Sequence, residues 1–171
     1  MCKIPIDENK ALLRTCLSQF PTGVAVVTAQ TDQGQPIGMT ISSFNSLSLT
    51  PALIAWCIDC RSASYRYFCE VKKFAITFLA ENQQEIAKRF ATQGCDKFAG
   101  LNIDPTQPII IPGGSAWLEC QIESTLLVGD HRMIIGKVLA CETTGNQPLV
   151  FCQSQFLSLS PKQGHRDKQA A

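Results

Sequence analysis

The sequence predicts a mainly β protein: a mostly antiparallel, Greek-key barrel with a few peripheral α-helices. About seven or eight apolar segments have the length of strands, whereas only three segments show helical spacing. The strands do not alternate regularly with helices, as a doubly wound parallel sheet requires. The 171 residues suit a single domain with one sizeable core, and no internal repeat or linker divides them.

A helix and then a hairpin are expected near the N-terminus. Leu12, Cys16 and Phe20 recur at helical spacing and predict an amphipathic helix. Residues 23–30 (GVAVVTAQ) are short and rich in β-branched side chains, which favours a strand. The turn sequence TDQGQP follows and leads into residues 37–44 (IGMTISSF), so the two segments predict a β-hairpin.

The middle of the chain mixes strands and short helices. Apolar runs predict strands over residues 52–58 (ALIAWCI) and 73–80 (KFAITFLA). Residues 62–71 are compatible with one or two helical turns capped by a serine, and residues 81–92 return to helical spacing.

The last part of the chain is expected to be β again after a long connection. Residues 92–114 are rich in Gly, Pro, Gln and Asp and predict that connection. Strand-like sequences follow over 116–130, 131–144 and 148–159, and the polar tail 161–171 is expected to be frayed.

Composition and charge exclude several classes of protein. The net charge is +1 and no basic patch stands out before the tail, so no nucleic-acid partner is expected. No apolar stretch approaches the roughly 18 residues of a membrane span, and the N-terminus lacks the pattern of a signal peptide. A cytoplasmic protein is therefore expected. Charged residues make up only 17%, which suggests an additional buried surface such as a subunit interface.

The nine cysteines are expected to be structural rather than a disulfide framework, because their number is odd and no secretion signal is present. Cys57 and Cys60 form a CxxC motif, whose functional alternatives are a redox pair or half a zinc site. No second CxxC exists, and His131 and His165 are distant in sequence, so no metal site is predicted.

The chain offers little side-chain chemistry of its own. His131 is the only histidine outside the tail, and no Walker A, GxGxxG or zinc-protease motif is present. Enzymes that use acid–base or nucleophilic side chains show pairs of such groups, and none is visible here. A cofactor is therefore expected to carry any reaction.

Residues 38–51 (GMTISSFNSLSLTP) are the first candidate for a binding segment. They hold four Ser and two Thr without a charge, and hydroxyls with free backbone N–H groups can bind a phosphate or the polar edge of a ring. Arg61 and Ser62, after the next strand, could supply a cation and a hydroxyl. The alternative is a strand and turn whose hydroxyls face solvent.

Two further candidates are a turn histidine and a lysine–phenylalanine pair. Gly129 and Asp130 predict a turn that leads into His131, whose imidazole could help to place a nicotinamide or could simply be exposed. Lys97 could reach an anionic group while Phe98 stacks on a ligand, although a surface Lys beside a buried Phe explains the same pair.

Taken together, these stretches resemble the flavin reductase family of short, flavin-binding split-barrel proteins. The ordered matches are FPTGVAVVTA, GMTISSFNSLSLTPALIAWCID, RSAS, FAITFLA, AKRFA, DKFAG, AWLEC and GDHRMIIGKV, and they cover about residues 10–157. The resemblance implies an FMN-binding split β-barrel that forms a homodimer with FMN or FAD near the subunit interface.

The resemblance also implies the residues of the flavin site. The hydroxyl-rich segment with an Asn-Ser-Leu turn, the end of the following strand with the RSAS turn, and three later segments would line it. These residues are Met39, Thr40, Ile41, Ser42, Ser43, Asn45, Ser46, Leu47, Cys57, Ile58, Asp59, Arg61, Ser62, Ser64, Phe78, Leu79, Ala80, Arg89, Phe90, Lys97 and Phe98. His131 matches the family histidine near the nicotinamide and is the candidate catalytic residue.

The implied activity is an NAD(P)H-dependent flavin reductase that delivers reduced FMN or FAD to a partner monooxygenase or another acceptor. Hydride passes from nicotinamide C4 to flavin N5, which requires ring stacking at about 3–3.5 Å and no side-chain acid or base. The alternatives are a module that holds its flavin tightly for electron transfer or redox sensing, and a split-barrel interaction protein without flavin.

Overall fold

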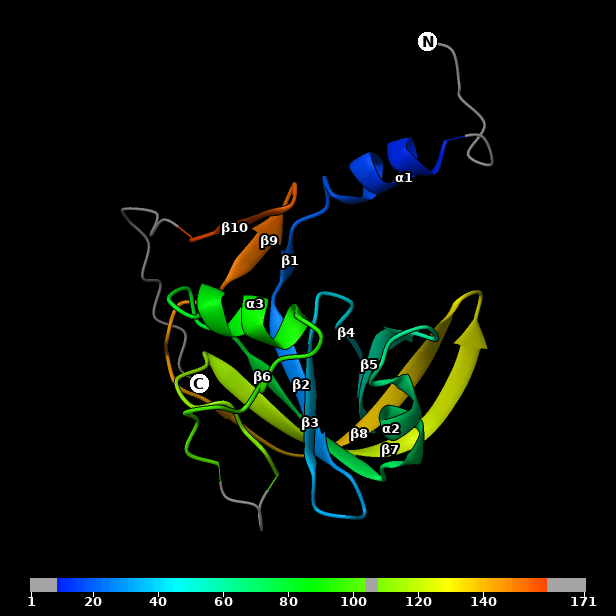
Figure 1. The fold of residues 1–171 in the computed structure, drawn as a ribbon, viewed down its shortest axis with the longest axis vertical. Coiled ribbons are helices and arrows are strands. Elements are labelled where there is room, and N and C mark those ends of the chain that lie inside the picture. Colours follow the sequence, from blue (N-terminus) through cyan, green and yellow to red (C-terminus); the bar gives the residue numbers. More distant parts are fainter. Residues whose placement is uncertain (1–8, 104–107, 160–171) are drawn as a thin grey trace.

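The computed structural model describes residues 9–103 and 108–159, which contain three helices and ten strands (Figure 1). In chain order these are α1 (Lys10–Leu17), β1 (Thr22–Gly23), β2 (Ala25–Gln30), β3 (Pro36–Ile41), β4 (Asn45–Leu49), β5 (Ala52–Asp59), α2 (Tyr65–Glu70), β6 (Lys73–Phe78), α3 (Gln84–Ala91), β7 (Ala116–Val128), β8 (His131–Thr143), β9 (Val150–Cys152) and β10 (Gln155–Leu157). The predicted mainly β fold is confirmed.

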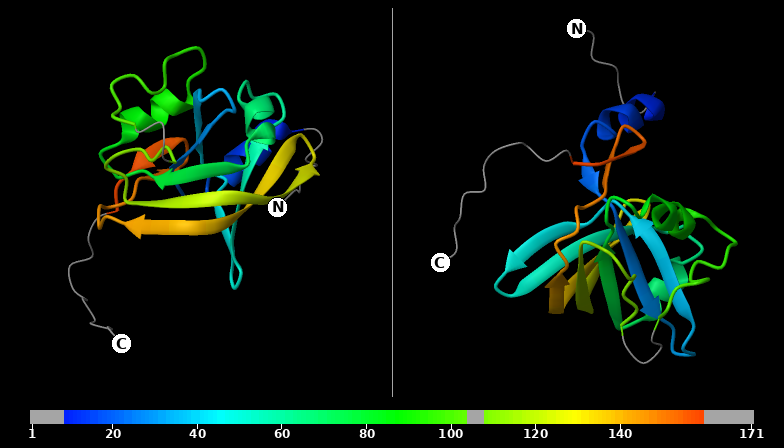
Figure 2. Two further views of the ribbon diagram at one scale, coloured as in Figure 1. Left: turned by 90° about the horizontal axis from the view of Figure 1, so that it is seen from below. Right: turned by 90° about the vertical axis from the view of Figure 1, so that its left-hand side faces the viewer.

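Seven strands form one antiparallel sheet in the order β3-β2-β6-β7-β8-β5-β4, and β1, β9 and β10 form a small second sheet. The large sheet is strongly twisted and curls round (Figure 2). Its edge strands, β3 and β4, belong to neighbouring segments of the chain but do not pair with each other. The barrel is therefore split along these two edges, and the hydroxyl-rich segment (residues 38–51) runs from β3 through the short connection into β4.

Strand β2 lies between two hydrophobic cores, which explains its almost continuous apolar sequence. Ala25 and Val27 belong to the core enclosed by the curled sheet and α2, where Trp56 packs edge-on against Phe68 at 5.2 Å between ring centroids. Val26 faces the second core, which includes residues of α3 and the segment before β9.

The long hairpin of β7 and β8 joins the two halves of the barrel. β7 pairs with β6, β8 pairs with β5, and the hairpin turns at Gly129, which has a positive φ of 61°. On β8, a methyl group at Gly136 would lie 2.5 Å from the ring of Phe74. Glycine at this position lets the buried ring pack directly on the strand.

The strand predictions are confirmed at β2, β3, β5, β6, β7 and β8, but the boundaries need two corrections. Asn45, Ser46 and Leu47 form no turn; they lie in strand β4, which pairs with β5. Its residues are mostly exposed, so it lacks the apolar alternation of a half-buried strand. The single strand expected over 148–159 is two short strands, β9 and β10, which form a hairpin.

The first helix is confirmed over a shorter span than the apolar spacing indicated. Asn9 caps it, with its side-chain oxygen accepting the Leu12 N–H at 2.9 Å. None of the helical residues is buried, and Phe20, beyond the helix, is 75% exposed. Figure 1 shows α1 standing away from the large sheet.

The connection after α3 is confirmed as irregular over its described residues, which are anchored to the barrel by two threonines. Thr28 donates its hydroxyl to the carbonyl of Ile109, and Thr77 Oγ1 accepts the Ile111 N–H at 3.0 Å. The expected tail over 161–171 lies outside the described residues. None of the three described helices has the length and hydropathy needed to cross a membrane.

Candidate functional site

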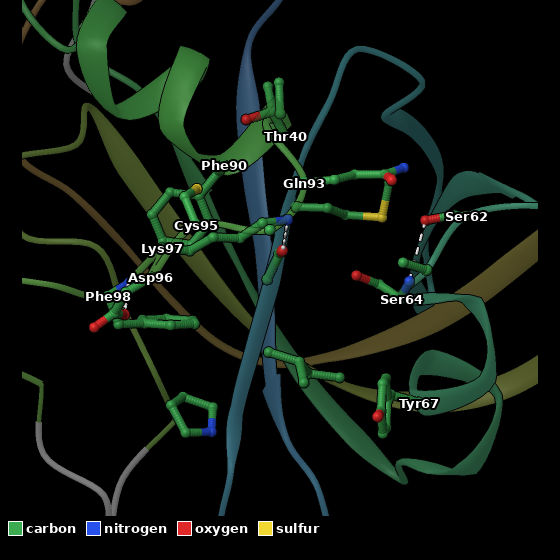
Figure 3. Close-up of a pocket in the computed structure, with 17 residues that line it drawn as sticks. Thr40, Ser62, Ser64, Tyr67, Phe90, Gln93, Cys95, Asp96, Lys97 and Phe98 are labelled. Atoms are coloured by element: carbon green, nitrogen blue, oxygen red, sulfur yellow. Dashed lines mark hydrogen bonds between the residues drawn. The ribbon is translucent and has the colours of Figure 1, made fainter.

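A cavity of about 470 Å³ lies beside the free edge of β3 (Figure 3). Three segments line it: β3 itself, the turn that precedes α2, and the end of α3 with the loop that follows. Its wall contains Met39, Thr40, Ser62, Ser64, Phe90, Lys97 and Phe98 from the predicted set. Three segments far apart in sequence thus meet at one sheet edge.

Helix α3 is held against β3 by a hydroxyl and by a ring contact. Thr40 donates its hydroxyl to the Ala87 carbonyl at 2.7 Å. Gly38 lets the fully buried ring of Phe90 approach, because a methyl group there would lie 2.7 Å from a ring carbon. Phe90 in turn packs edge-on against Phe98, with ring centroids 5.1 Å apart. These contacts fix the apolar side of the cavity.

Lys97 places a positive charge in the cavity. Its Nζ donates to the Gly38 carbonyl at 2.9 Å, along the edge of β3 that none of the other described strands pairs with (Figure 3). Burial lowers the pKa of the Lys97 ammonium from its ordinary value. An ammonium that is partly desolvated without a carboxylate gains most from an anionic ligand.

Two serine hydroxyls face the same cavity from the turn before α2. Ser62 Oγ accepts the Ser64 N–H at 3.3 Å, a contact drawn in Figure 3. The Ser62 carbonyl accepts the Tyr65 N–H at 2.9 Å and so starts the helical turn. The hydroxyls of this turn and the Lys97 ammonium make a donor set that suits a phosphate.

A second hollow of about 490 Å³ is lined by residues 42–45, the middle of the hydroxyl-rich segment, and by residues just before β2. Ser42, Ser43 and Asn45 line it from one side, and Phe78 contributes an aromatic wall. Thr22 also lines it, and the buried hydroxyl of Thr22 has no hydrogen-bond partner in the described part of the chain. A buried hydroxyl without a partner is costly unless a ligand or water satisfies it.

Ser43 also connects the two halves of the split barrel. Its Oγ accepts the Cys57 N–H at 3.0 Å and donates to the Cys57 carbonyl at 3.2 Å, as a neighbouring strand would. Burial raises the pKa of the Cys57 thiol above its ordinary value. The hydroxyl thus ties the end of β3 to the middle of β5.

The strand register brings His131 to the end of β5, directly opposite Asp59. His131 Nδ1 lies 2.7 Å from Asp130 Oδ1, and this hydrogen bond to the imidazole lowers the pKa of the Asp130 carboxyl. Asp59 makes two side-chain hydrogen bonds with Arg61, at 2.7 and 3.1 Å, which hold the pKa of Asp59 well below its usual range.

Arg61, which the sequence suggested as the cation for a phosphate, lies outside the first cavity's wall and forms an ion pair. Its guanidinium is paired with Asp59, its side chain is 79% exposed, and it does not line the first cavity. Lys97 is the cation in that wall. A contact between Arg61 and a phosphate therefore stays a prediction that requires the ion pair to rearrange.

The remaining predicted residues contribute less directly to the two hollows. The side chains of Ile41, Ile58, Leu79 and Ala80 are buried, so only their backbone could meet a ligand. Leu47 is 48% exposed on β4 and, like Ser46, lines neither hollow.

Arg89 acts on the cavity through the loop that it holds. Its Nη1 donates to the Ala99 carbonyl at 2.9 Å, which anchors the loop carrying Lys97 and Phe98. The cavity wall also contains residues that the sequence did not single out, including Tyr67, Gln93 and Cys95. The second hollow adds Phe20, Pro21, Thr22 and Gly23, which belong to the FPTGVAVVTA stretch and were within reach of the sequence argument.

Residues 17–160 match the family described as "Flavin reductase like domain". The chain belongs to this family. The FMN reductase (NADH) SmoA of Agrobacterium fabrum is 38% identical over 155 residues, which cover 90% of this chain and 88% of that protein. The reductase component of the flavin-dependent trigonelline monooxygenase of Acinetobacter baylyi is 41% identical over 128 residues, or 74% of this chain but only 41% of that protein.

Solved structures of the family share the fold. The NADH:FAD oxidoreductase SgcE6 of Streptomyces globisporus, in complex with NAD and FAD fragments, superposes with a TM-score of 0.85 at 28% identity. The superposition covers 94% of this chain and 99% of that one. The split barrel expected from the resemblance is thereby confirmed.

The residues of the two hollows fit a flavin. The cavity beside β3 offers Lys97 and serine hydroxyls to a phosphate, and the wall of the second hollow contains Phe78 and Thr22, whose buried hydroxyl has no partner among the described residues. A cluster of three or more potential metal ligands is absent from residues 9–103 and 108–159, and Cys57 and Cys60 are both free thiols there.

We expect Ser43→Ala to destabilise the fold by about 1–2 kcal/mol, because two hydrogen bonds to the Cys57 backbone are lost. Thermal denaturation gives the stability, and hydrogen exchange should show faster exchange of the Cys57 amide. Ser42→Ala is the matched control, since no side-chain hydrogen bond of Ser42 is recorded with the described residues. Equal stability of the two variants would refute the bridging role.

Proposed function

We propose that this protein is an NAD(P)H-dependent flavin reductase. The observation that carries the proposal is the cavity at the free edge of β3, where a partly buried ammonium and serine hydroxyls adjoin the hydroxyl-rich segment. Membership of the flavin reductase-like family supports it, as do relatives named for reduction of FMN or FAD with NADH. We propose FMN or FAD as the flavin and NADH or NADPH as the electron donor.

Each part of the site has a proposed task. Lys97, Ser62 and Ser64 bind the flavin phosphate, and the donors of the second hollow, including Thr22, face the polar edge of the ring. His131, oriented by Asp130, places the nicotinamide. When bound, the flavin supplies a ring that accepts hydride, so the protein needs only to bind, align and exclude water.

The reduced flavin passes to another protein in this proposal. A relative named as the reductase component of a flavin-dependent monooxygenase supports a monooxygenase as the acceptor. A cytoplasmic location is proposed with it. The other candidate is an electron-transfer or redox-sensing module that keeps its flavin, and the partly buried cation in the cavity suits tight binding equally well.

Steady-state oxidation of the nicotinamide distinguishes these functions. The protein is mixed with NADH or NADPH and increasing free FMN or FAD, and the disappearance of the reduced nicotinamide absorbance is followed. A rate that rises with added flavin supports the reductase. A rate independent of added flavin supports the module, and no oxidation of either nucleotide contradicts the proposal.

Lys97→Met should weaken FMN binding by about tenfold, because a charge-assisted hydrogen bond to the phosphate is lost. Because the pKa of Lys97 is lower in the folded than in the unfolded protein, its positive charge disfavours folding at every pH below the folded-state pKa. This cost decreases as the pH rises from the folded-state pKa to the ordinary pKa of a lysine. The thermal midpoint near neutral pH should therefore not fall.

Fluorescence titration with FMN and thermal denaturation check both parts. Lys88→Met is the matched control, because Lys88 is exposed and pairs with Glu85 at 2.7 Å on α3. Unchanged FMN affinity in Lys97→Met would refute the phosphate assignment.

His131→Ala should lower kcat/KM for the nicotinamide by about tenfold, because a group that positions one of two reacting rings is removed. FMN affinity should remain close to that of the wild type. The kcat/KM of Asp130→Asn should lie between the values of the wild type and of His131→Ala, because this variant keeps a hydrogen-bond acceptor beside Nδ1 but removes the charge. Parallel loss of FMN binding in His131→Ala would place this residue on the flavin side.

We also propose a homodimer in which the second copy covers α1 and the open side of the second hollow. α1 has no buried residue, and Leu17 is 65% exposed beside Phe20 at 75%. Phe20 also lines the second hollow, so the apolar surface and the proposed ring site are continuous. A second copy of the chain would bury this surface and enclose the flavin near the interface.

Phe20→Ser should shift the protein from dimer to monomer, because a large apolar anchor is removed from the proposed interface. Sedimentation equilibrium measures the change. Leu139→Ser is the control, since Leu139 is 45% exposed on β8 and lies away from both hollows. A wild-type chain that sediments as a monomer would contradict the proposal directly.

A further inference from the structure

A third hollow adjoins the cavity beside β3 and continues it past Tyr67. Its volume is about 330 Å³, and it is lined by the turn between β2 and β3 and by residues of α2. Tyr67 belongs to the wall of both spaces. Along the chain, Gln35 in the third hollow is followed directly by Pro36 in the cavity. A ligand held in the cavity can therefore extend into the third hollow.

Tyr67 presents an aromatic ring at the junction of the two spaces. It lies on α2 and is 42% exposed. None of the ring pairs among the described residues includes it, so a ligand ring can stack on it. Figure 3 shows Tyr67 on the same side of the cavity as Ser62 and Ser64, the proposed phosphate donors. An aromatic ring in this place suits a nucleobase, because every base has a face that can stack.

The turn between β2 and β3 gives the third hollow a polar wall that the backbone holds in place. The Thr31 N–H donates to the Gln35 carbonyl at 3.0 Å, and Thr31 Oγ1 accepts the Gln35 N–H at 3.2 Å. This turn carries Gln33 and Gln35, two exposed residues that line the hollow. A glutamine amide has a donor and an acceptor side by side, which matches the N6 and N7 edge of adenine.

The charges of the third hollow disfavour a phosphate there. Its charged residues are Asp32, Arg66 and Glu70, so carboxylates outnumber cations. Arg66 Nε is also paired with Glu70 Oε1 at 3.2 Å. The Lys97 ammonium and the serine hydroxyls lie in the neighbouring cavity. The anionic part of a ligand therefore belongs in the cavity, and a neutral ring with hydroxyl groups belongs in the third hollow.

We propose that the third hollow binds the adenosine of FAD and that the protein therefore binds FAD more tightly than FMN. This inference rests on the proposed function. FMN ends at its phosphate, whereas FAD continues through a second phosphate to ribose and adenine. The two phosphates lie in the cavity, and the adenine stacks on Tyr67. The edge of the adenine meets the amides of Gln33 and Gln35, and the Asp32 carboxylate accepts from the ribose hydroxyls.

The affinities for FMN and FAD, measured side by side, test the inference, because the two flavins differ only in the adenylyl group. Titration calorimetry of the wild type should give a dissociation constant for FAD about tenfold below that for FMN. Tyr67→Ala should remove most of this difference, because the stacking ring is lost. Tyr67→Phe should keep the difference, because it retains a ring. Thermal denaturation checks that both variants are folded.

Gln33→Ala tests the third hollow without changing the wall of the cavity. Of the three spaces, Gln33 lines only the third hollow, so its replacement should weaken FAD binding about threefold and leave FMN binding unchanged. Gln121→Ala is the matched control, since Gln121 is exposed on β7 and lines none of the three spaces.

Each remaining outcome contradicts a different statement. Equal affinities of the wild type for FMN and FAD would overturn the inference and leave the proposed function standing. A preference for FAD that survives in both Tyr67→Ala and Gln33→Ala would do the same. A raised KM for NADH in Gln33→Ala at unchanged FAD affinity would assign the third hollow to the nicotinamide nucleotide instead. A protein that binds neither flavin contradicts the proposed function, and the inference fails with it.

Discussion

The pairing of β8 with both β5 and β7 positions the functional parts of this molecule. Its register sets His131 opposite Asp59 and Arg132 opposite Ile58, so the hairpin turn, the end of β5 and the start of α2 meet at one end of the barrel. A slip of one residue would move each of these side chains to the opposite face of the sheet. Gly136 secures the register from within, because only a strand without a side chain at that point accommodates the Phe74 ring.

The two cations near the site differ in their partners. Arg61 forms an ion pair with Asp59 at the protein surface. Lys97 is partly desolvated, and among the described residues its ammonium donates to a backbone carbonyl instead of a carboxylate. An ion pair already formed gains little from a ligand, but a cation with a depressed pKa gains charge stabilisation from an anion. Of these two cations, Lys97 therefore gains more from an anionic ligand than Arg61 does.

Most of the fold was predictable because buried strands carry their own signal. The hairpin of β2 and β3 and the strand β5 stand out as β-branched or apolar runs flanked by turn residues. β4 stands where the resemblance implies an Asn-Ser-Leu turn, and the residues alone do not predict it, because an exposed edge strand needs no apolar face. Only the family resemblance predicts from the sequence that the cavity segments lie together. The ion pair of Arg61 and the place of Lys97 in the cavity wall depend on tertiary contacts that sequence patterns do not reveal.

The Lys97 ammonium, carried by the loop after α3, also covers part of the free edge of β3. Unpaired edge strands invite pairing with another chain, and natural proteins often block them with lysine. Here the ammonium covers the Gly38 carbonyl, while α3 covers β3 through the Thr40 hydroxyl. An anion that draws the ammonium away exposes this carbonyl to water unless the ligand itself covers the strand. The ammonium that would bind an anion in the cavity is thus the same group that blocks the free edge of β3.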